Sequence, residues 1–295
     1  MRWTFRVARM LEPRQFFFRS LSPHGFHRVA YVEWGDPTNH RVVVCVHGLT
    51  RSGRDFDDLA RALAPSFRVL CPDVAGRGDS EWLRDPSDYT IATYLVDLAT
   101  LLAHARVEQV AWVGTSMGGI LGMLTAAQPE TPIDRLVVND VGPLLEPAAI
   151  VRIGSYVGSS PVFDKFEQLD AYVREISTTF GKLTDAQWHH LSRSVAQQTQ
   201  DGRWKLKYDP GIAVPFRATG SQSRDLWAQW DAIQCPTLVL RGAESDLLSA
   251  STAAAMRERG PRAKVVEFPD VGHAPMLLTP DQIAPVVQFL QAMPG

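Results

Sequence analysis

The sequence predicts an α/β protein in which helices cover both faces of a mostly parallel β-sheet. Short apolar runs with strand character alternate with helix-like segments, and this alternation resumes at Cys235 after an interruption. Alternating strands and helices place neighbouring strands parallel, because each helix returns the chain to the same end of the sheet. The expected strands are residues 28–34, 42–46, 67–72, 109–114, 135–139, 236–242 and 264–268, and the expected helices are 55–63, 91–105 and 117–127.

A long segment after Pro143 interrupts the alternation. From about residue 144 to residue 222 there are helix-like stretches at 164–178 and 184–198, followed by a hairpin-like stretch at 201–210. We expect this segment to be an insertion in a core domain formed by residues 25–143 and 223–295. Ligands of parallel sheets bind beyond the carboxyl ends of the strands, so functional residues are expected in the loops that follow the strands.

The motif G-x-S-x-G over residues 114–118 joins an apolar strand-like run to a helix-like segment. A serine on a tight turn between strand and helix needs Gly114 and Gly118 on its two sides, because the helix passes close to the strand. Such a turn lifts the Oγ of Ser116 clear of the backbone and points the first N–H groups of the helix at the group under attack. The motif therefore predicts a serine nucleophile.

The residues that follow the run at 42–46 are candidates for an oxyanion hole. Gly48 lets a backbone N–H face a developing negative charge, and we expect the N–H groups of Leu49 and Met117 to be the two donors. His47 is better explained as a residue that shapes this loop.

Charged residues after the last three expected strands supply a base and an acid. His273 follows the run at 264–268 and is the candidate general base. Asp246 follows the run at 236–242 and is the candidate acid that orients the imidazole. Asp140 is the alternative acid, because it too follows directly on a strand.

Five ordered motifs carry a resemblance to a known family: His47-Gly48-Leu49, Gly76-Arg77-Gly78-Asp79-Ser80, Gly114-Thr115-Ser116-Met117-Gly118-Gly119, Arg241-Gly242 with Ser245-Asp246, and Gly272-His273. Together they resemble the α/β-hydrolase superfamily, most closely its cap-bearing branch of serine esterases, C–C hydrolases and haloperoxidase-like enzymes. The resemblance runs from about Tyr31 to the C-terminus, apart from the segment after Pro143. It implies a mostly parallel eight-stranded sheet with a mainly helical cap inserted after the sixth strand.

The cap implied by this resemblance corresponds to residues 144–222. Its position over the strand ends makes it the expected determinant of substrate choice. We expect Ile153, Tyr156 and Phe163 to line the substrate pocket.

The predicted activity is hydrolysis of carboxylic esters through an acyl-enzyme. His273 would take the proton of Ser116 during attack on the acyl carbon and would then activate water. Haloalkane dehalogenases and epoxide hydrolases are excluded, because the family members with these activities need a carboxylate where Ser116 stands.

Other activities of the family stay open. The C–C hydrolases of ring-fission dienoates share the Ser-Met-Gly-Gly elbow but typically have tryptophan after the catalytic histidine, where Ala274 stands here. Lactone hydrolysis, acyl transfer and cofactor-free perhydrolysis use the same triad, and a ligand sensor without turnover is a further alternative. The choice among esters, thioesters, lactones and polyesters is not decided by the sequence, nor is the oligomeric state.

Composition narrows the setting of the protein. The chain has 295 residues, 45% of them hydrophobic and 21% charged, with a net charge of -2. Without a basic stripe it is not expected to bind nucleic acid, and without a long apolar run it is not expected to span a membrane. Three cysteines without close pairs favour a reducing, cytoplasmic location. No metal-ligand spacing is present, so we expect neither a metal nor a cofactor.

The N-terminal residues 1–24 differ from the rest in being rich in arginine and aromatic residues. Arginines interrupt the apolar centre that a signal peptide needs. We expect an ordered extension that packs its aromatic side chains on the body, with a weak targeting segment or a membrane-surface contact as alternatives.

Overall fold

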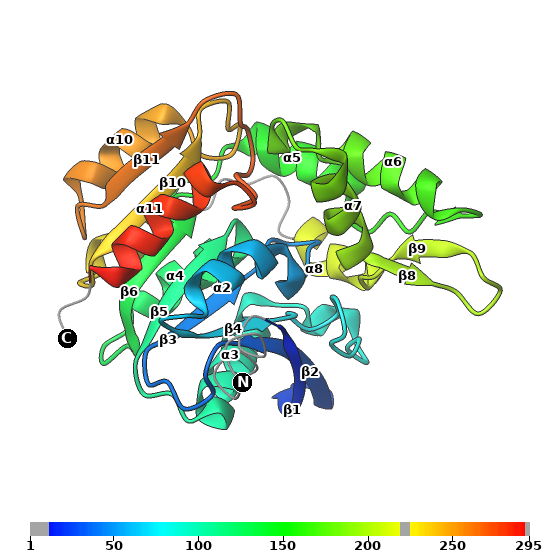
Figure 1. Cartoon of the computed structure of the whole chain (residues 1–295), viewed down its shortest axis with the longest axis horizontal. Helices are drawn as coiled ribbons and strands as arrows, with labels where there is room; N and C mark the ends of the chain where they lie inside the picture. The colour runs from blue at the N-terminus through cyan, green and yellow to red at the C-terminus, as the bar shows by residue number, and fades with distance from the viewer. Residues whose placement is uncertain (1–11, 219–224, 293–295) are drawn as a thin grey trace, which may run out of the picture.

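The computed structural model describes residues 12–218 and 225–292, which contain an eight-stranded sheet with the strand order β1-β2-β4-β3-β5-β6-β10-β11 (Figure 1). The strands from β4 to β11 in this order run parallel, whereas β1 and β2 pair antiparallel. The bounds are β1 (Arg14–Ser22), β2 (Gly25–Trp34), β3 (Val42–Val46), β4 (Arg68–Pro72), β5 (Val110–Thr115), β6 (Ile133–Asn139), β10 (Thr237–Gly242) and β11 (Lys264–Phe268). The predicted fold class is confirmed.

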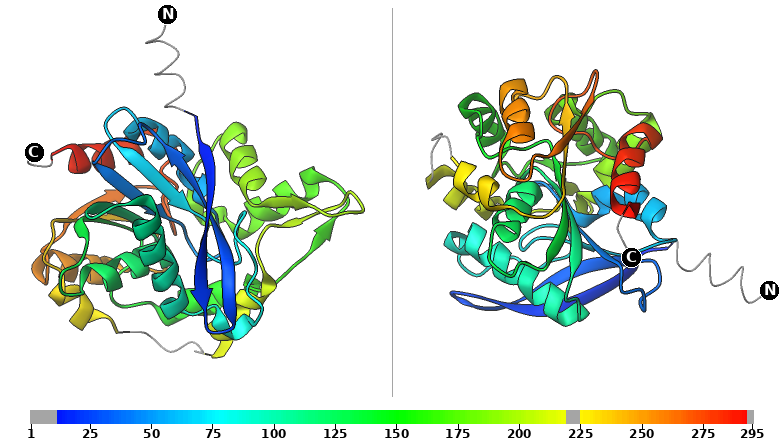
Figure 2. Two further views of the ribbon diagram at one scale, coloured as in Figure 1. Left: turned by 90° about the horizontal axis from the view of Figure 1, so that it is seen from below. Right: turned by 90° about the vertical axis from the view of Figure 1, so that its left-hand side faces the viewer.

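Helices cover both faces of the sheet (Figure 2). One face carries α2 (Asp57–Leu63) and α11 (Pro280–Gln291), and the other carries α3 (Ile91–Ala105), α4 (Met117–Ala126), α9 (Trp227–Ala232) and α10 (Ala250–Glu258). Central strands are therefore buried on both sides, which explains why β3 is an uninterrupted apolar run rather than an alternating one.

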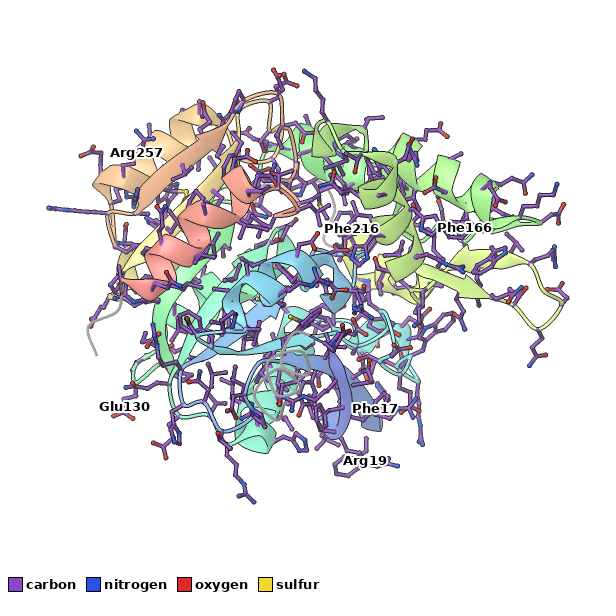
Figure 3. All side chains as sticks on the ribbon, in the orientation of Figure 1. Phe17, Arg19, Glu130, Phe166, Phe216 and Arg257 are labelled. Carbon is purple, nitrogen blue, oxygen red and sulfur yellow. The ribbon has the colours of Figure 1, made fainter. Side chains whose placement is uncertain are left out.

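Residues 147–218, which we call the insert, lie between β6 and α9 and form elements of their own. These are α5 (Pro147–Tyr156), β7 (Val162–Phe163), α6 (Phe166–Ile176), η3 (Thr178–Phe180), α7 (Asp185–Ser194), β8 (Ala196–Gln198), β9 (Trp204–Leu206), η4 (Pro210–Ile212) and α8 (Ala213–Ala218). The strands β7, β9 and β8 pair in this order as a small separate sheet. Aromatic packing joins α6 to this sheet: the ring of Phe166, labelled in Figure 3, lies 5.4 Å from that of Trp204 in β9.

Two predictions within the insert need correction. The expected helix at 184–198 ends at Ser194, and the expected hairpin at 201–210 is instead formed by β8 and β9, with its turn near Asp201. A capping box at Thr184 begins α7, but nothing in the local sequence marks where the helix gives way to a short strand.

The insert contacts the loops that follow the strands of the sheet. The N–H of Gly78 donates to the carbonyl of Lys207 (3.0 Å), and the N–H of Gly272 donates to the carbonyl of Thr179 (2.7 Å). Figure 1 shows the insert beside the carboxyl ends of the parallel strands. None of the helices in the described residues has the length and apolar character required to cross a bilayer.

The N-terminal boundary expected at residue 24 is wrong, because β1 belongs to the main sheet. Its Phe16 stacks on Tyr31 of β2 at 5.4 Å, and Phe18 is buried in the core. Of the aromatic residues in the described part of this extension, Phe18 is buried, whereas Phe16 and Phe17 are 37% and 44% exposed. Residues 1–11, including Arg2, lie outside the described residues.

Candidate active site

Ser116 stands on the sharp turn between β5 and α4, as the motif predicts. Its backbone has φ 54° and ψ -115°, a strained conformation for a residue with a side chain. The two glycines are sterically required: a Cβ on Gly114 would lie 2.2 Å from the carbonyl oxygen of Gly118, and one on Gly118 would lie 1.9 Å from that of Val46. The close passage of helix over strand thus explains both glycines.

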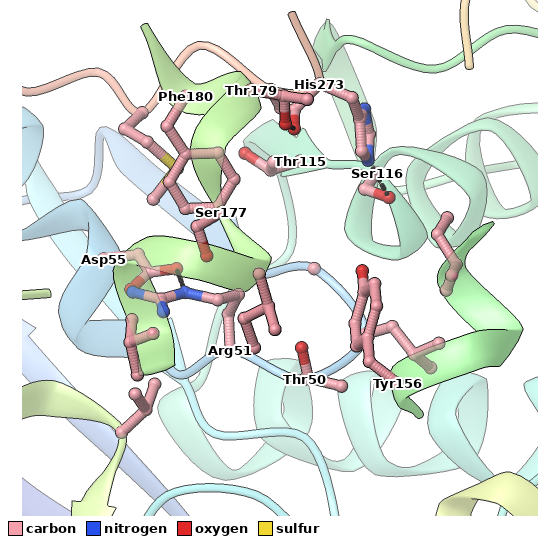
Figure 4. Close-up of a pocket in the computed structure, with 18 of the residues that line it drawn as sticks. Thr50, Arg51, Asp55, Thr115, Ser116, Tyr156, Ser177, Thr179, Phe180 and His273 are labelled. Carbon is pink, nitrogen blue, oxygen red and sulfur yellow. Dashed lines mark hydrogen bonds and ion pairs between the residues drawn. The ribbon is translucent and has the colours of Figure 1, made fainter. Parts of the chain in front are cut away.

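A continuous hydrogen-bonded chain joins Ser116 to a histidine and a carboxylate. The Nε2 of His273 lies 3.0 Å from the Oγ of Ser116, and its Nδ1 lies 2.8 Å from the Oδ2 of Asp140 (Figure 4 shows the first contact). With the proton on Nδ1 donated to the carboxylate, Nε2 is free to accept the serine proton. This is the geometry that general-base activation of a serine needs.

Asp140 is fully buried and held by further donors. Its Oδ1 accepts from the backbone N–H of Gly242 (2.8 Å), and its Oδ2 also accepts from the hydroxyl of Ser245 (2.7 Å). A buried carboxylate needs such donors because its oxygens have no contact with water. They also fix the oxygen that contacts His273.

The structure does not bring Asp246, the expected acid, to the histidine. Its carboxylate is 38% exposed and accepts two bonds from Arg152 of α5, at 2.5 Å and 2.8 Å. The physical reason lies in the loop after β10, which turns Ser245 inward to Asp140 and leaves its neighbour Asp246 on the outside. The alternative residue, Asp140, occupies the position beside the imidazole.

Leu49 and Met117 both lie beside Ser116. Met117 is the first residue of α4, where helix N–H groups have no intrahelical acceptor. In the described ranges, neither residue donates a backbone hydrogen bond from its N–H. The two groups are thus available to a ligand atom near Ser116, although their role as oxyanion donors stays a prediction.

His47 shapes the loop that carries Leu49, as expected. Its Nδ1 lies 2.7 Å from the carbonyl oxygen of Gly48, and its Nε2 accepts from the N–H of Val74 at 2.9 Å. Burial lowers the pKa of His47 to about 4, so the ring is neutral near pH 7.

Arg77 is a site residue that sequence reasoning noted only as part of a motif. Its side chain is fully buried, and its Nε donates to the carbonyl oxygen of Leu49 at 2.8 Å. Its Nη1 donates to the hydroxyl of Tyr94. No carboxylate of the described residues lies within ion-pair distance of it. A buried arginine thus braces the loop that carries Leu49, and only its burial, which the sequence does not reveal, could have identified it.

Two cavities meet at Ser116 and Leu49. The smaller, which we call the polar chamber, has a volume of about 80 Å³ and is lined by residues that include Thr50, Arg51, Arg152, Tyr156, Ser177 and His273 (Figure 4). The larger, which we call the apolar chamber, has a volume of about 370 Å³ and is lined by residues that include Ile91, Met117, Ile120, Ile150, Ile153 and Phe216.

Two of the three expected pocket residues line a chamber and the third does not. Ile153 lines both chambers and Tyr156 lines the polar chamber. Phe163 lines neither, because it lies on β7, where its ring packs on Tyr172 at 5.5 Å. The alternation of buried and exposed positions in a two-residue strand was not visible in the sequence.

The fold and this site define a class of protein. Residues 43–286 match the model of the alpha/beta hydrolase family, and the chain belongs to that family. It is therefore a hydrolase with an eight-stranded, mostly parallel sheet. Among the described residues, no group of three or more His, Cys, Asp or Glu side chains is placed to hold a metal ion.

One curated relative and two solved structures are similar to this chain over nearly its whole length. A 3-hydroxybutyrate-oligomer hydrolase of Cupriavidus necator is 50% identical over 285 residues, which cover 94% of this chain and 97% of the relative. The crystal structure of an alpha/beta hydrolase from Novosphingobium aromaticivorans is 39% identical with a TM-score of 0.86, covering 96% of this chain and 99% of that one. A putative hydrolase from Rickettsia typhi is 29% identical with a TM-score of 0.89, covering 96% of this chain and all of that one.

Proposed function

We propose that the protein is a serine hydrolase that cleaves the ester bonds of short 3-hydroxybutyrate oligomers through an acyl-enzyme. The observation that carries the proposal is the hydrogen-bonded chain from Ser116 through His273 to Asp140. The oligomer is inferred from the Cupriavidus necator relative, which aligns with nearly the whole chain.

In the first half of the reaction, His273 takes the proton of Ser116 while the Oγ attacks the acyl carbon. The buried Asp140 holds the imidazole with Nδ1 protonated and stabilises the imidazolium that forms. The N–H groups of Leu49 and Met117 stabilise the oxyanion, a contribution of about 3 kcal/mol for each well-placed donor. His273 then passes the proton taken from Ser116 to the leaving oxygen as the bond between that oxygen and the acyl carbon breaks, which leaves the acyl-enzyme.

In the second half, His273 activates a water molecule as general base. Attack of this water on the acyl-enzyme releases the acid and restores Ser116. These steps use the hydrogen-bonded side chains of Ser116, His273 and Asp140 together with two backbone N–H groups, and one nitrogen of His273 carries the proton between Ser116, the leaving group and water.

The insert acts as a cap in this proposal. It contributes Ile153 and Phe216 to the apolar chamber, and Arg152 and Tyr156 to the polar chamber. Substrate would thus lie between the strand ends and the insert, where water is partly excluded.

The direct test is hydrolysis of the linear dimer and trimer of 3-hydroxybutyrate, followed by chromatography of the released monomer. We expect turnover by the native protein and loss of about a millionfold in the Ser116→Ala variant. A ring-fission dienoate in the same assay tests C–C hydrolysis. Turnover of the dienoate without turnover of the oligomers would refute the proposal, and turnover of neither, nor of an aryl ester, would favour a ligand sensor.

A further inference from the structure

The two chambers differ in chemistry as well as in size. The polar chamber has apolar walls but also contains hydroxyl and guanidinium groups, including those of Arg51, Ser177 and Tyr156, and the carboxylate of Asp55 that pairs with Arg51. The apolar chamber is more than four times as large and is lined mainly by aliphatic and aromatic side chains. A substrate whose ester bond lies at Ser116 places its acyl part in one chamber and its alcohol part in the other.

The position of His273 decides which part lies where. His273 must give its proton to the leaving oxygen, so the alcohol part departs on the side of the imidazole. His273 lines the polar chamber and not the apolar one, whereas Met117, an expected oxyanion donor, lines only the apolar chamber. The alcohol part therefore lies in the polar chamber and the acyl chain in the apolar chamber.

Arg51 offers hydrogen-bond donors to the polar chamber. It stands on the same loop as Leu49, and its side chain is only 12% exposed. Its Nε and Nη2 donate to the carboxylate of Asp55 at 2.8 Å and 2.6 Å, and Nη2 also reaches the carbonyl of Leu191 at 3.3 Å. A guanidinium has five N–H groups, so the two on Nη1 remain for another acceptor.

A buried hydroxyl faces the same space. Ser177 follows α6, is 5% exposed and lines the polar chamber with Arg51 (Figure 4). Its Oγ makes no hydrogen bond with another of the described residues, and it is not enclosed away from the chamber. A hydroxyl in this position can donate to water or to the acceptor oxygen of a ligand in the chamber.

On the basis of the proposed function, we propose that Arg51, assisted by Ser177, binds the free carboxylate of the hydroxy acid that leaves. The enzyme then cleaves the ester bond nearest the free carboxyl end of an oligomer and releases one unit at a time. The bond between the acyl carbon and the 3-oxygen of the terminal unit breaks, that oxygen takes the proton from His273, and the remaining chain stays on Ser116. The small volume of the polar chamber suits a single short unit.

The pairing of Arg51 with Asp55 does not oppose this role. The carboxylate of Asp55 occupies one edge of the guanidinium and holds it in place, which reduces the entropy lost when the substrate binds. Arg152 also lines the chamber, but it belongs to the insert and forms an ion pair with the exposed Asp246. Arg51, in contrast, belongs to the same loop as Leu49, and its backbone N–H donates to the carbonyl oxygen of Gly48. Its backbone is therefore fixed relative to Leu49.

The test compares the 3-hydroxybutyrate dimer with its methyl ester at the carboxyl end. The two compounds share the scissile bond and the acyl unit and differ in terminal charge. We expect the native protein to prefer the free acid by roughly 30- to 100-fold in kcat/KM, mainly through KM, as for a lost hydrogen bond to a charged group. A trimer labelled in its carboxyl-terminal unit should release the label first as monomer.

Paired variants locate the contact. Arg51→Gln with Asp55→Asn removes the ion pair without leaving a buried charge, and the preference for the free acid should fall to within a few fold. The matched control is Arg54→Gln with Asp57→Asn, a neighbouring pair at 2.5 Å whose arginine lines neither chamber. The control should keep the preference, and the thermal midpoint of each variant reports its folding.

Several results would overturn the inference. Equal use of the free acid and the methyl ester by the native protein would do so, while hydrolysis of both would leave the proposed function intact. Loss of the preference in Arg152→Gln but not in the Arg51 variant would place the contact elsewhere. If the Arg51 variant does not fold, inhibition of aryl ester hydrolysis by 3-hydroxybutyrate and by its methyl ester decides: equal inhibition contradicts a carboxylate site.

Discussion

The ends of β6 and β10, adjacent strands of the sheet, each carry an aspartate close to the same site. Asp140 follows β6 directly, is fully buried and accepts hydrogen bonds from Gly242, Ser245 and His273. Asp246 lies beyond β10, is 38% exposed and pairs with Arg152. The end of β10 and the loop after it therefore supply donors that hold the carboxylate of Asp140, and the loop does not supply the carboxylate itself. A carboxylate beyond a strand end is suited to orient a histidine only when the neighbouring loops enclose it.

Replacing each aspartate by asparagine should affect the activity very differently at the two strand ends. Asp140→Asn is expected to lower kcat/KM for an aryl ester by roughly ten-thousandfold, because the amide favours the wrong tautomer of His273. Asp246→Asn should lower it by no more than a few fold, because only an exposed ion pair is lost. Steady-state kinetics measures kcat/KM for both variants. Equal losses would contradict the assignment of Asp140, rather than Asp246, as the residue that orients His273.

His47, which follows β3, is a second fully buried titratable residue near the site, but it is a base that burial keeps neutral. Its folded-state pKa of about 4 lies below the usual 6.5, so the unfolded chain binds more protons between these pH values. The stability contributed by neutral His47 is present above pH 6.5 and is lost as the pH falls towards 4, by about 3 kcal/mol.

Urea unfolding of the native protein and of His47→Gln between pH 4 and 7.5 measures this contribution. The free energy of unfolding should fall more steeply with acid in the native protein than in the variant. Parallel curves would show that His47 does not titrate on unfolding.

Ser245 sharpens the comparison by testing the support that the β10 loop gives to Asp140. Ser245→Ala removes the hydroxyl that donates to Asp140 at 2.7 Å, and we expect kcat/KM to fall about tenfold. Steady-state kinetics with an aryl ester measures this loss. Ser249→Ala, at the N-cap of α10, is the matched control and should lower stability while leaving kcat/KM within about twofold of the native value.

Substitutions in the insert should give the smallest effects and should depend on whether the residue lines a chamber. Ile153→Ala is expected to change the ranking of acyl chain lengths by a few fold, because Ile153 lines both chambers. Phe163→Ala should lower the thermal midpoint and leave the ranking as it is, because its ring packs on Tyr172. A series of aryl esters with increasing acyl length measures both. A shifted ranking in the Phe163 variant would contradict the division.

Sequence patterns predicted those parts of the site that depend on backbone geometry. The glycines around Ser116 are imposed by the close passage of α4 over β5 and β3, so their spacing identifies the turn. His273 was identified because a single histidine follows the last strand. The choice between Asp140 and Asp246 depends on which way a loop turns, and the sequence contains no signal for it.

Other features depended on tertiary packing and were missed for that reason. The strand β1 contains three consecutive phenylalanines, and their consecutive placement hides the alternation that the pairing with β2 imposes. Arg51 and Arg77 read as ordinary charged residues, and only their burial beside Leu49 and Ser116 assigns them to the site. Burial of a charge is a property of the folded chain, so local patterns do not report it.

The rate at which a fluorophosphonate labels Ser116 tests the central claim most directly. Labelling requires the nucleophile, the base and the orienting carboxylate, but no particular substrate. The account predicts a single adduct at Ser116, none in Ser116→Ala, a rate in Asp246→Asn within a few fold of the native rate, and a rate about a thousandfold lower in Asp140→Asn. An adduct at another serine, or slow labelling of the Asp246 variant beside normal labelling of the Asp140 variant, would contradict it.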